Sequence, residues 1–243
     1  MSSISENFAS IRKRMESACA RAGRDPGDVR LVGVTKTVPM DRIREGVGAG
    51  ITILGENYIQ EARVKVDSLA GLEVSWHFIG HLQSNKAKAA VECFDWIETV
   101  DRLSLAAALD RQAGKLGRRI PVLIQVNVGD EESKSGVSVE GLPSLFRSVS
   151  AMEGLVVRGL MTLPPYFDDA EKVRPYFRLL RDCLNRLRLE AGKPEELTEL
   201  SMGMSHDFEV AIEEGATLVR IGTALFGARP APSLPTSAHR GLT

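Results

Sequence analysis

The sequence predicts a single α/β domain of the (β/α)8, or TIM-barrel, type. Its 243 residues match the length of such a barrel. Apolar runs of four to seven residues, rich in Val and Ile, recur eight times and are separated by stretches of helical period. The runs are continuous rather than alternating, as expected for parallel strands that are buried on both faces. An open, doubly wound sheet is the alternative architecture for this alternation.

The eight expected strands are the apolar runs themselves. In chain order they span residues 31–35, 51–54, 74–79, 95–98, 121–127, 155–161, 197–202 and 218–221. Gly46, Gly48 and Gly50 precede a strand instead of following one. They therefore predict a helix-to-strand turn rather than a dinucleotide-binding loop.

Single apolar stripes predict the helices. A helix before the first strand is predicted by the spacing of Phe8, Ile11, Met15 and Ala18. Two later helices are predicted by Leu105, Leu109, Ala113 and Leu116, and by Phe177, Leu180, Leu184 and Leu187. Ser205 is followed by Asp207 and Glu209, which is the pattern of an N-cap with acidic residues in the first turn.

The barrel is expected to occupy residues 1–228, including the N-terminal helix, because no Gly/Ser linker or shift in composition divides this stretch. Residues 229–243 contain Pro230, Pro232 and Pro235 and have no apolar stripe, so we expect a flexible tail. Apolar residues that face outward are not concentrated in one region. We therefore expect a monomer.

Charge and hydropathy exclude several classes of protein. With 31 Lys+Arg against 32 Asp+Glu and 5% aromatic residues, the chain lacks the basic, stacking surface of a nucleic-acid-binding protein. No apolar run approaches the 18 or more residues of a membrane span. The N-terminus carries charges within its apolar pattern and does not read as a secretory signal, so a cytoplasmic protein is expected. The three cysteines give no disulfide framework and are expected to be core thiols.

Lys36 is the first candidate for chemistry, because the active face of a barrel lies at the carboxyl ends of its strands. It follows the first strand at the rim of an apolar mouth. Partial desolvation and a neighbouring cation such as Arg220 would favour the free amine, which can attack a carbonyl and hold it as a Schiff base. The alternative is a surface lysine whose stem lies along the rim.

A phosphate site is expected after strands seven and eight. Ser201, Met202 and Gly203 follow one strand, and Gly222 and Thr223 follow the next. Small residues, hydroxyls and one turn of helix are the parts with which barrels bind phosphate, although such glycines can also serve only tight turns. A Schiff-base lysine opposite a phosphate cup indicates an aldehyde that bears a phosphate, such as pyridoxal 5′-phosphate (PLP).

Arg220 lies two residues before the expected cup. If it points inward, it faces the pyridine nitrogen, and its permanent charge keeps that nitrogen unprotonated. Such a partner weakens the cofactor as an electron sink. An outward arginine between sheet and helix is the alternative.

Two other signals are set aside. His77 and His81 are four residues apart, but the strand pattern between them and the lack of a third ligand argue against zinc, and no metal is expected. Lys134 lies in a polar loop after the fifth strand and is a weaker Schiff-base candidate than Lys36.

The sequence resembles the pyridoxal phosphate homeostasis family. The resemblance rests on VGVTKTVP at 32–39, GENYIQEA at 55–62, WHFIGHLQSNK at 76–86, QVNVGDEESKSGV at 125–137, RGLMTLPP at 158–165 and LSMGMSHDFEVAIEEGATLVRIGTALFGAR at 200–229. It implies the barrel of the alanine racemase N-terminal domain, fold type III among PLP proteins. It also implies that Lys36 holds PLP as an internal aldimine. By position, it assigns Asn57 and His77 to the ring, Arg220 to the pyridine nitrogen, and Ser201, Met202, Gly222 and Thr223 to the phosphate.

The resemblance implies a carrier that buffers PLP, a vitamin B6 cofactor, and hands it over to PLP-requiring apoenzymes. Many relatives read K-T-K where this chain has Lys36-Thr37-Val38, so any role of a second lysine is absent. An amino-acid racemase is the alternative function. It would need a second base, and none of Tyr58, Tyr166 and Tyr176 is marked as one by spacing. Since 243 residues also leave no room for the further domain of a racemase, we expect a carrier and no catalytic residues.

Overall fold

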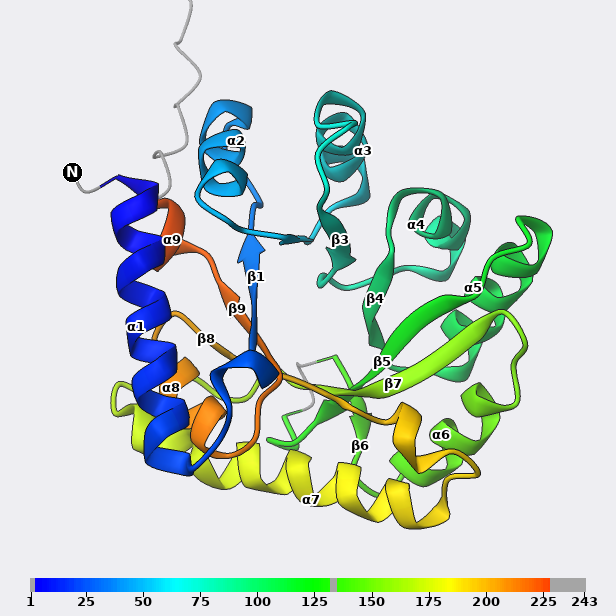
Figure 1. Cartoon of the computed structure of the whole chain (residues 1–243). Coiled ribbons are helices and arrows are strands. Elements are labelled where there is room, and N and C mark those ends of the chain that lie inside the picture. Colours follow the sequence, from blue (N-terminus) through cyan, green and yellow to red (C-terminus); the bar gives the residue numbers. More distant parts are fainter. Residues whose placement is uncertain (1–2, 132–134, 228–243) are drawn as a thin grey trace, which may run out of the picture.

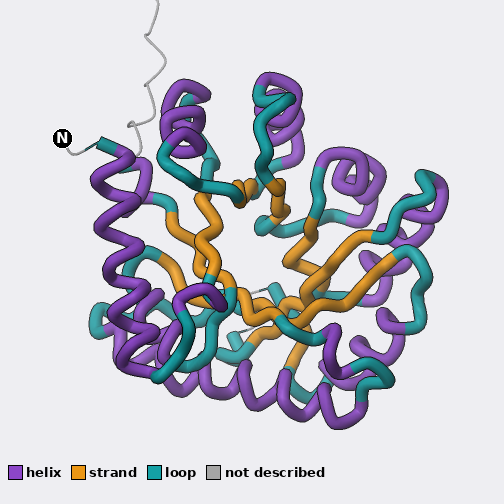
Figure 2. The backbone as a smooth tube through the Cα atoms, viewed as in Figure 1, coloured by secondary structure: helices purple, strands orange, loops and turns teal. Residues whose placement is uncertain are grey.

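The computed structural model describes residues 3–131 and 135–227. Within these ranges, eight parallel strands form a closed barrel that helices surround (Figures 1 and 2). The strand order is β4-β3-β2-β1-β9-β8-β7-β5, and β4 pairs with β5 to close the ring. The predicted (β/α)8 barrel is thus confirmed. The open sheet is excluded because β4 and β5, which would be the edge strands of such a sheet, are hydrogen-bonded to each other.

The barrel strands are β1 (Arg30–Val34), β2 (Ile53–Glu56), β3 (Ser75–Phe78), β4 (Trp96–Val100), β5 (Ile120–Asn127), β7 (Leu155–Met161), β8 (Glu199–Met204) and β9 (Leu218–Ile221). The bounds of β7 and β9 are those predicted. Both β2 and β8 start and end two residues later than expected, and their last residues, Glu56 and Met204, still pair with the neighbouring strand. The two-residue strand β6 (Val137–Ser138), beside the end of β5, is too short to give a periodic signal.

The helices are α1 (Ile4–Ala22), α2 (Met40–Gly48), α3 (Ile59–Ser68), α4 (Ala87–Cys93), α5 (Leu103–Lys115), α6 (Leu142–Ser150), α7 (Arg174–Glu190), α8 (Phe208–Glu213) and α9 (Thr223–Phe226). The predicted N-terminal helix is α1, which begins with a capping box between Ser3 and Glu6. The predicted cap at Ser205 is wrong. The N-cap of α8 is Asp207, whose carboxylate accepts a hydrogen bond from the Met204 N–H at 2.6 Å.

None of the helices in the described ranges combines the length and the apolarity that crossing a membrane requires. Two of the predicted core thiols, Cys19 and Cys183, are buried, and Cys93 is half-buried. The Pro-containing segment 229–243, predicted as a flexible tail, lies outside the described residues.

The core has two parts. A large apolar shell fills the space between the strands and the surrounding helices. A smaller cluster consists of Val32, Ile53, Leu123, Met161 and Leu218, one from each of five strands. Side chains from five strands of one closed barrel can meet only inside it, so this cluster is an apolar layer of the barrel interior.

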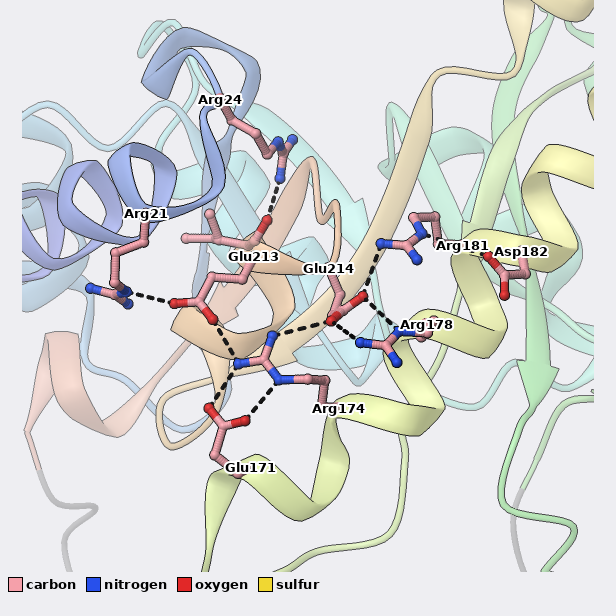
Figure 3. Close-up of polar contacts among 10 residues, drawn as sticks. Arg21, Arg24, Glu171, Arg174, Arg178, Arg181, Asp182, Glu213 and Glu214 are labelled. Carbon is pink, nitrogen blue, oxygen red and sulfur yellow. Dashed lines mark hydrogen bonds and ion pairs between the residues drawn. The ribbon is translucent and has the colours of Figure 1, made fainter.

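An ionic cluster attaches α1 to the ring of helices (Figure 3). Glu213, at the end of α8, pairs with Arg21 of α1 at 2.7 Å and with Arg174 of α7 at 2.6 Å. The adjacent Glu214 accepts hydrogen bonds from three arginines of α7, namely Arg174, Arg178 and Arg181. Through Glu213, the helix that precedes β1 is thereby connected to α7 and α8.

Gly159 offers a direct test of the barrel geometry. Its φ is +153°, and a Cβ placed there would lie 1.9 Å from the Glu199 carbonyl oxygen of the neighbouring strand. We therefore expect Gly159→Ala to lower the free energy of unfolding by about 3 kcal/mol in urea titrations, because backbone must move to admit the methyl group.

Gly114, in α5, is the matched control, since nothing lies within 4 Å of its added Cβ. Gly114→Ala should raise stability by about 0.5–1 kcal/mol through helix propensity. Equal effects of the two substitutions would contradict the strand register between β7 and β8.

Candidate functional site

Lys36 lies in a tight turn directly after β1. The Val38 N–H donates to the Thr35 carbonyl at 2.9 Å and closes the turn. Lys36 is half-buried, as the sequence analysis expected of a lysine at the rim. Thr37, the next residue, has a φ of +61°, a conformation that is unusual for a β-branched residue. The backbone beside the candidate lysine is therefore strained.

A small cavity brings Lys36 together with the expected phosphate cup. Its lining includes Lys36 and Val38 after β1, and Gly222, Thr223 and Gly227 after β9. Gly222 is the N-cap of α9, so the first N–H groups of this helical turn have no carbonyl partner within the helix. Thr223 is exposed. An amine and a group of N–H and O–H donors thus share one cavity.

Arg220 points into the barrel, which decides between the two orientations considered for it. It is 3% exposed, and its guanidinium donates to Ser201 Oγ at 2.6 Å and to the Thr162 carbonyl at 2.8 Å. Because an arginine side chain does not lose its proton in proteins, a permanent positive charge lies beneath the mouth.

Glu98 supplies the opposite charge. It lies on β4, is fully buried, and accepts from Ser201 Oγ at 2.5 Å and from His77 Nδ1 at 2.6 Å. The His77 ring also stacks on Trp96, with ring centroids 5.3 Å apart. Side chains of β3, β4, β8 and β9 are thereby joined in one network, which we call the interior network: His77, Glu98, Ser201 and Arg220.

Burial and charge oppose each other in this network. Burial alone would raise the pKa of Glu98, but the hydrogen bond and charge of His77, the charge of Arg220 and the Ser201 hydroxyl together hold that pKa below its ordinary value. Burial lowers the pKa of Arg220, and the carboxylates of Glu98 and Asp207 oppose this effect. The arrangement therefore keeps Glu98 ionised.

Glu98 was predicted only as the end of the fourth strand and not as a functional residue. One signal was present: it is a carboxylate within the otherwise buried strand Trp96–Val100. A charge in such a strand needs a partner, but the sequence does not say which.

Asn57 directly follows β2, which pairs with β1 on the side away from β9. It lines a cavity of about 310 Å³ with Ile79, Gly80, His81, Gln125, Ser135, Leu163 and Pro164. Its side-chain oxygen is buried and has no hydrogen-bond partner among the residues that the structure describes. A buried amide oxygen without a partner is costly, so this atom is suited to a bound donor.

Two of the residues assigned to the phosphate are placed deeper than the cup. The Ser201 hydroxyl is engaged by Glu98 and Arg220. The Met202 side chain is fully buried in the shell between strands and helices, which leaves its backbone for any contact at the mouth.

The two histidines that were set aside as zinc ligands have separate partners in the structure. In residues 3–131 and 135–227, no three His, Cys, Asp or Glu side chains gather as a metal site would require. His77 bonds to Glu98, whereas His81 Nδ1 lies 3.0 Å from Ser135 Oγ. The second lysine candidate, Lys134, lies outside the described residues.

Known proteins resemble the chain in both sequence and fold. The family model "Alanine racemase, N-terminal domain" matches residues 3–230. A protein of Aquifex aeolicus named "Pyridoxal phosphate homeostasis protein" is 47% identical over 224 residues, which are 92% of this chain and 97% of that protein. The protein of the same name from Escherichia coli K12 is 41% identical over 232 residues, 94% and 98% of the two chains.

Solved structures of two proteins are also similar to this chain. The structure of PipY from Synechococcus elongatus with PLP bound has a TM-score of 0.81 and 40% identity, and the match covers 92% of this chain and all of PipY. An alanine racemase from Corynebacterium glutamicum has a TM-score of 0.71 at 18% identity, over 95% of this chain and 62% of that enzyme. This second likeness concerns the fold alone.

The interior network predicts the effect of Glu98→Gln. Removing the carboxylate leaves the buried charge of Arg220 with only the carboxylate of Asp207 to oppose it, so the free energy of unfolding at pH 7 should fall by about 3 kcal/mol or more. The pKa of Glu98 is lowered in the fold, so its contribution is present above the ordinary value of 4.5 and is lost as the pH falls further. The variant should therefore lose less stability than wild type on acidification below about pH 4.5.

Urea titrations from pH 3 to 7 measure both effects. Glu73→Gln, at an exposed position, is the control and should follow the wild-type profile. A Glu98→Gln variant with wild-type stability and the wild-type pH slope would show that the carboxylate does not balance Arg220.

Proposed function

Because this chain belongs to the pyridoxal phosphate homeostasis family, which is built on the alanine racemase N-terminal domain, we propose that it binds PLP at the barrel mouth and acts as a carrier of that cofactor. The relatives carry the name of homeostasis proteins, and PipY has been solved with PLP bound. The cofactor and the homeostasis role follow from this membership. The residues that hold PLP are our assignment.

The residues of the mouth fit PLP chemically. An aldehyde can be bound covalently by an amine, and Lys36 provides an amine at a cavity that Gly222 and Thr223 also line. A phosphate calls for N–H and O–H donors, which the first turn of α9 presents. The buried side-chain oxygen of Asn57 has no hydrogen-bond partner among the described residues, so it can accept a hydrogen bond from a bound ligand.

Each residue receives a role from this fit. We assign Lys36 to the aldehyde, Asn57 and His77 to the ring, Arg220 to the pyridine nitrogen, and Ser201, Met202, Gly222 and Thr223 to the phosphate. In this assignment Ser201 acts through its contact with Arg220 and its backbone, since its hydroxyl is engaged in the interior network. When bound, the cofactor would supply an aldehyde, and Lys36 is the residue whose amine would hold it.

The placement of Arg220 is the observation that favours a carrier over an enzyme. Its guanidinium is held inside the barrel by Ser201 and Thr162, and it keeps its proton. A pyridine nitrogen beside this cation stays unprotonated and withdraws less electron density from a reacting carbon. The site therefore favours holding the cofactor over stabilising a carbanion.

The proposal also covers the oligomeric state, the location and the partners of the protein. We infer that the chain works as a monomer in the cytoplasm and delivers PLP to PLP-requiring apoenzymes. The family name of the relatives supports the delivery role. Residues 1–228 are proposed as the binding domain and residues 229–243 as a flexible tail.

Lys36→Ala tests the assignment of the lysine. Wild type mixed with PLP should absorb as a lysine adduct, and borohydride reduction should attach the cofactor to the peptide that contains Lys36. The variant should lose the band and the labelled peptide, because the amine is gone. The control is Lys88→Ala, an exposed lysine of α4, which should behave as wild type. The same band in Lys36→Ala would mean that another lysine, with Lys134 as the first candidate, holds the cofactor.

A direct comparison of transfer and turnover tests the carrier. Loaded protein should restore the activity of a PLP-requiring aminotransferase apoenzyme, and should not racemise L- or D-alanine beyond the rate of free PLP. Racemisation at about 1 s⁻¹ or faster, in the range of ordinary enzymes, would overturn the carrier in favour of a racemase.

A further inference from the structure

The turn that carries Lys36 depends on contacts from outside the mouth. In the turn of residues 35–38, Lys36 is the second residue and Thr37 the third, with φ at +61°. Tight turns that need positive φ at the third position normally have Gly or Asn there. A threonine holds this conformation only where its surroundings impose it.

Two side chains of α3 bind the backbone on either side of Lys36. Lys65 Nζ donates to the Thr35 carbonyl at 2.6 Å, and the Thr37 N–H donates to Glu61 Oε1 at 2.6 Å. Lys65 also donates to the same Glu61 oxygen at 2.6 Å. The peptide groups before and after Lys36 are thereby connected through one ion pair.

A third residue anchors this pair. Glu56, at the end of β2, is fully buried and accepts from Lys65 Nζ at 2.6 Å and from Thr35 Oγ1 at 2.7 Å. Lys65 is 5% exposed, and its three N–H groups meet three acceptors, on Thr35, Glu56 and Glu61. We call Glu56, Glu61 and Lys65 the α3 clamp.

A purely structural role would be to fasten α3 to the barrel. That role needs the Lys65 to Glu56 pair, but it does not need contacts to the backbone of residues 35 and 37. Those two contacts converge on the single turn that presents Lys36, and they coincide with the positive φ of Thr37. Their location favours positioning of the lysine.

We propose that Glu61 and Lys65 are positioning residues, which hold the turn of residues 35–38 in its strained form and so direct the Lys36 amine toward the cofactor. The inference rests on the proposed role of Lys36. Without the clamp, Thr37 relaxes toward negative φ and the Lys36 peptide rotates. Condensation depends on how the amine is placed, and a displacement of about 1 Å can cost a factor on the order of 100 in rate.

The test uses Glu61→Gln and Lys65→Met. Glu61→Gln keeps the size of a partly exposed side chain while removing its charge, so its fold should be retained. In both variants, stopped-flow absorbance with added PLP should show adduct formation slowed by about 10-fold or more and the Kd raised by a similar factor. Far-ultraviolet circular dichroism and thermal unfolding report on the fold.

An ion pair of the same spacing supplies the control. Lys88 and Glu92 are four residues apart on α4, with side chains 72% and 34% exposed. Lys88→Met and Glu92→Gln should leave both rate and Kd within about 2-fold of wild type, since they touch no part of the Lys36 turn.

Thr37→Asn separates positioning from stability. Asparagine tolerates positive φ better than threonine does. Added to Glu61→Gln, it should recover part of the lost rate, whereas a clamp that only stabilised the fold would show no such rescue. If Lys65→Met does not fold, Glu61→Gln and its Thr37→Asn rescue decide the question.

Two failures are distinguishable. If wild type is labelled at Lys36 but the Glu61→Gln variant forms the adduct at the wild-type rate and affinity, the clamp is not a positioning device and the proposed function stands. If wild type is not labelled at Lys36, the proposed function fails, and the positioning role fails with it.

Discussion

The buried charge of Arg220 is the constraint on which the rest of the mouth depends. A guanidinium inside a barrel loses its hydration, so the interior must supply acceptors and a counter-charge. Ser201 and Thr162 provide the acceptors, and Glu98, reached through the Ser201 hydroxyl, provides the charge. One consequence is that four strands are joined above the apolar layer of the interior. Another is that the Arg220 guanidinium is held below the mouth by hydrogen bonds to Ser201 and Thr162.

Two buried groups of charged side chains, the interior network and the α3 clamp, contact different parts of the mouth. The interior network lies inside the barrel and presents Arg220 and His77 from below. The α3 clamp lies between the strands and the outer helices and acts on the turn that contains Lys36. Burial of charge is costly in both places, and hydrogen bonds offset that cost: the Arg220 guanidinium donates to Ser201 and Thr162, and all three N–H groups of Lys65 have acceptors. The turn that contains Lys36 and the side chain of Arg220 are thus held by different elements of the fold.

The sequence predicted those features that follow from local periodicity. The strands β7 and β9 were predicted with their bounds, and Lys36 and Gly222, which were chosen for their positions after strands, line one cavity. The roles of Glu98 and Lys65 could not be predicted, because their partners lie far away in the chain. Ser201 is 103 residues from Glu98, and Thr35 is 30 residues from Lys65. The predicted cap at Ser205 failed for a local reason, since the chain continues as strand to Met204 and the helix starts only after Asp207.

The most direct test of the account is the protonation state of the bound cofactor. Nitrogen-15 magnetic resonance of protein loaded with PLP labelled at the pyridine nitrogen reports whether that atom carries a proton. A charged Arg220 beneath the mouth predicts the chemical shift of an unprotonated nitrogen at neutral pH. The shift of a pyridinium nitrogen would contradict the placement of Arg220 at the ring and, with it, the argument for a carrier.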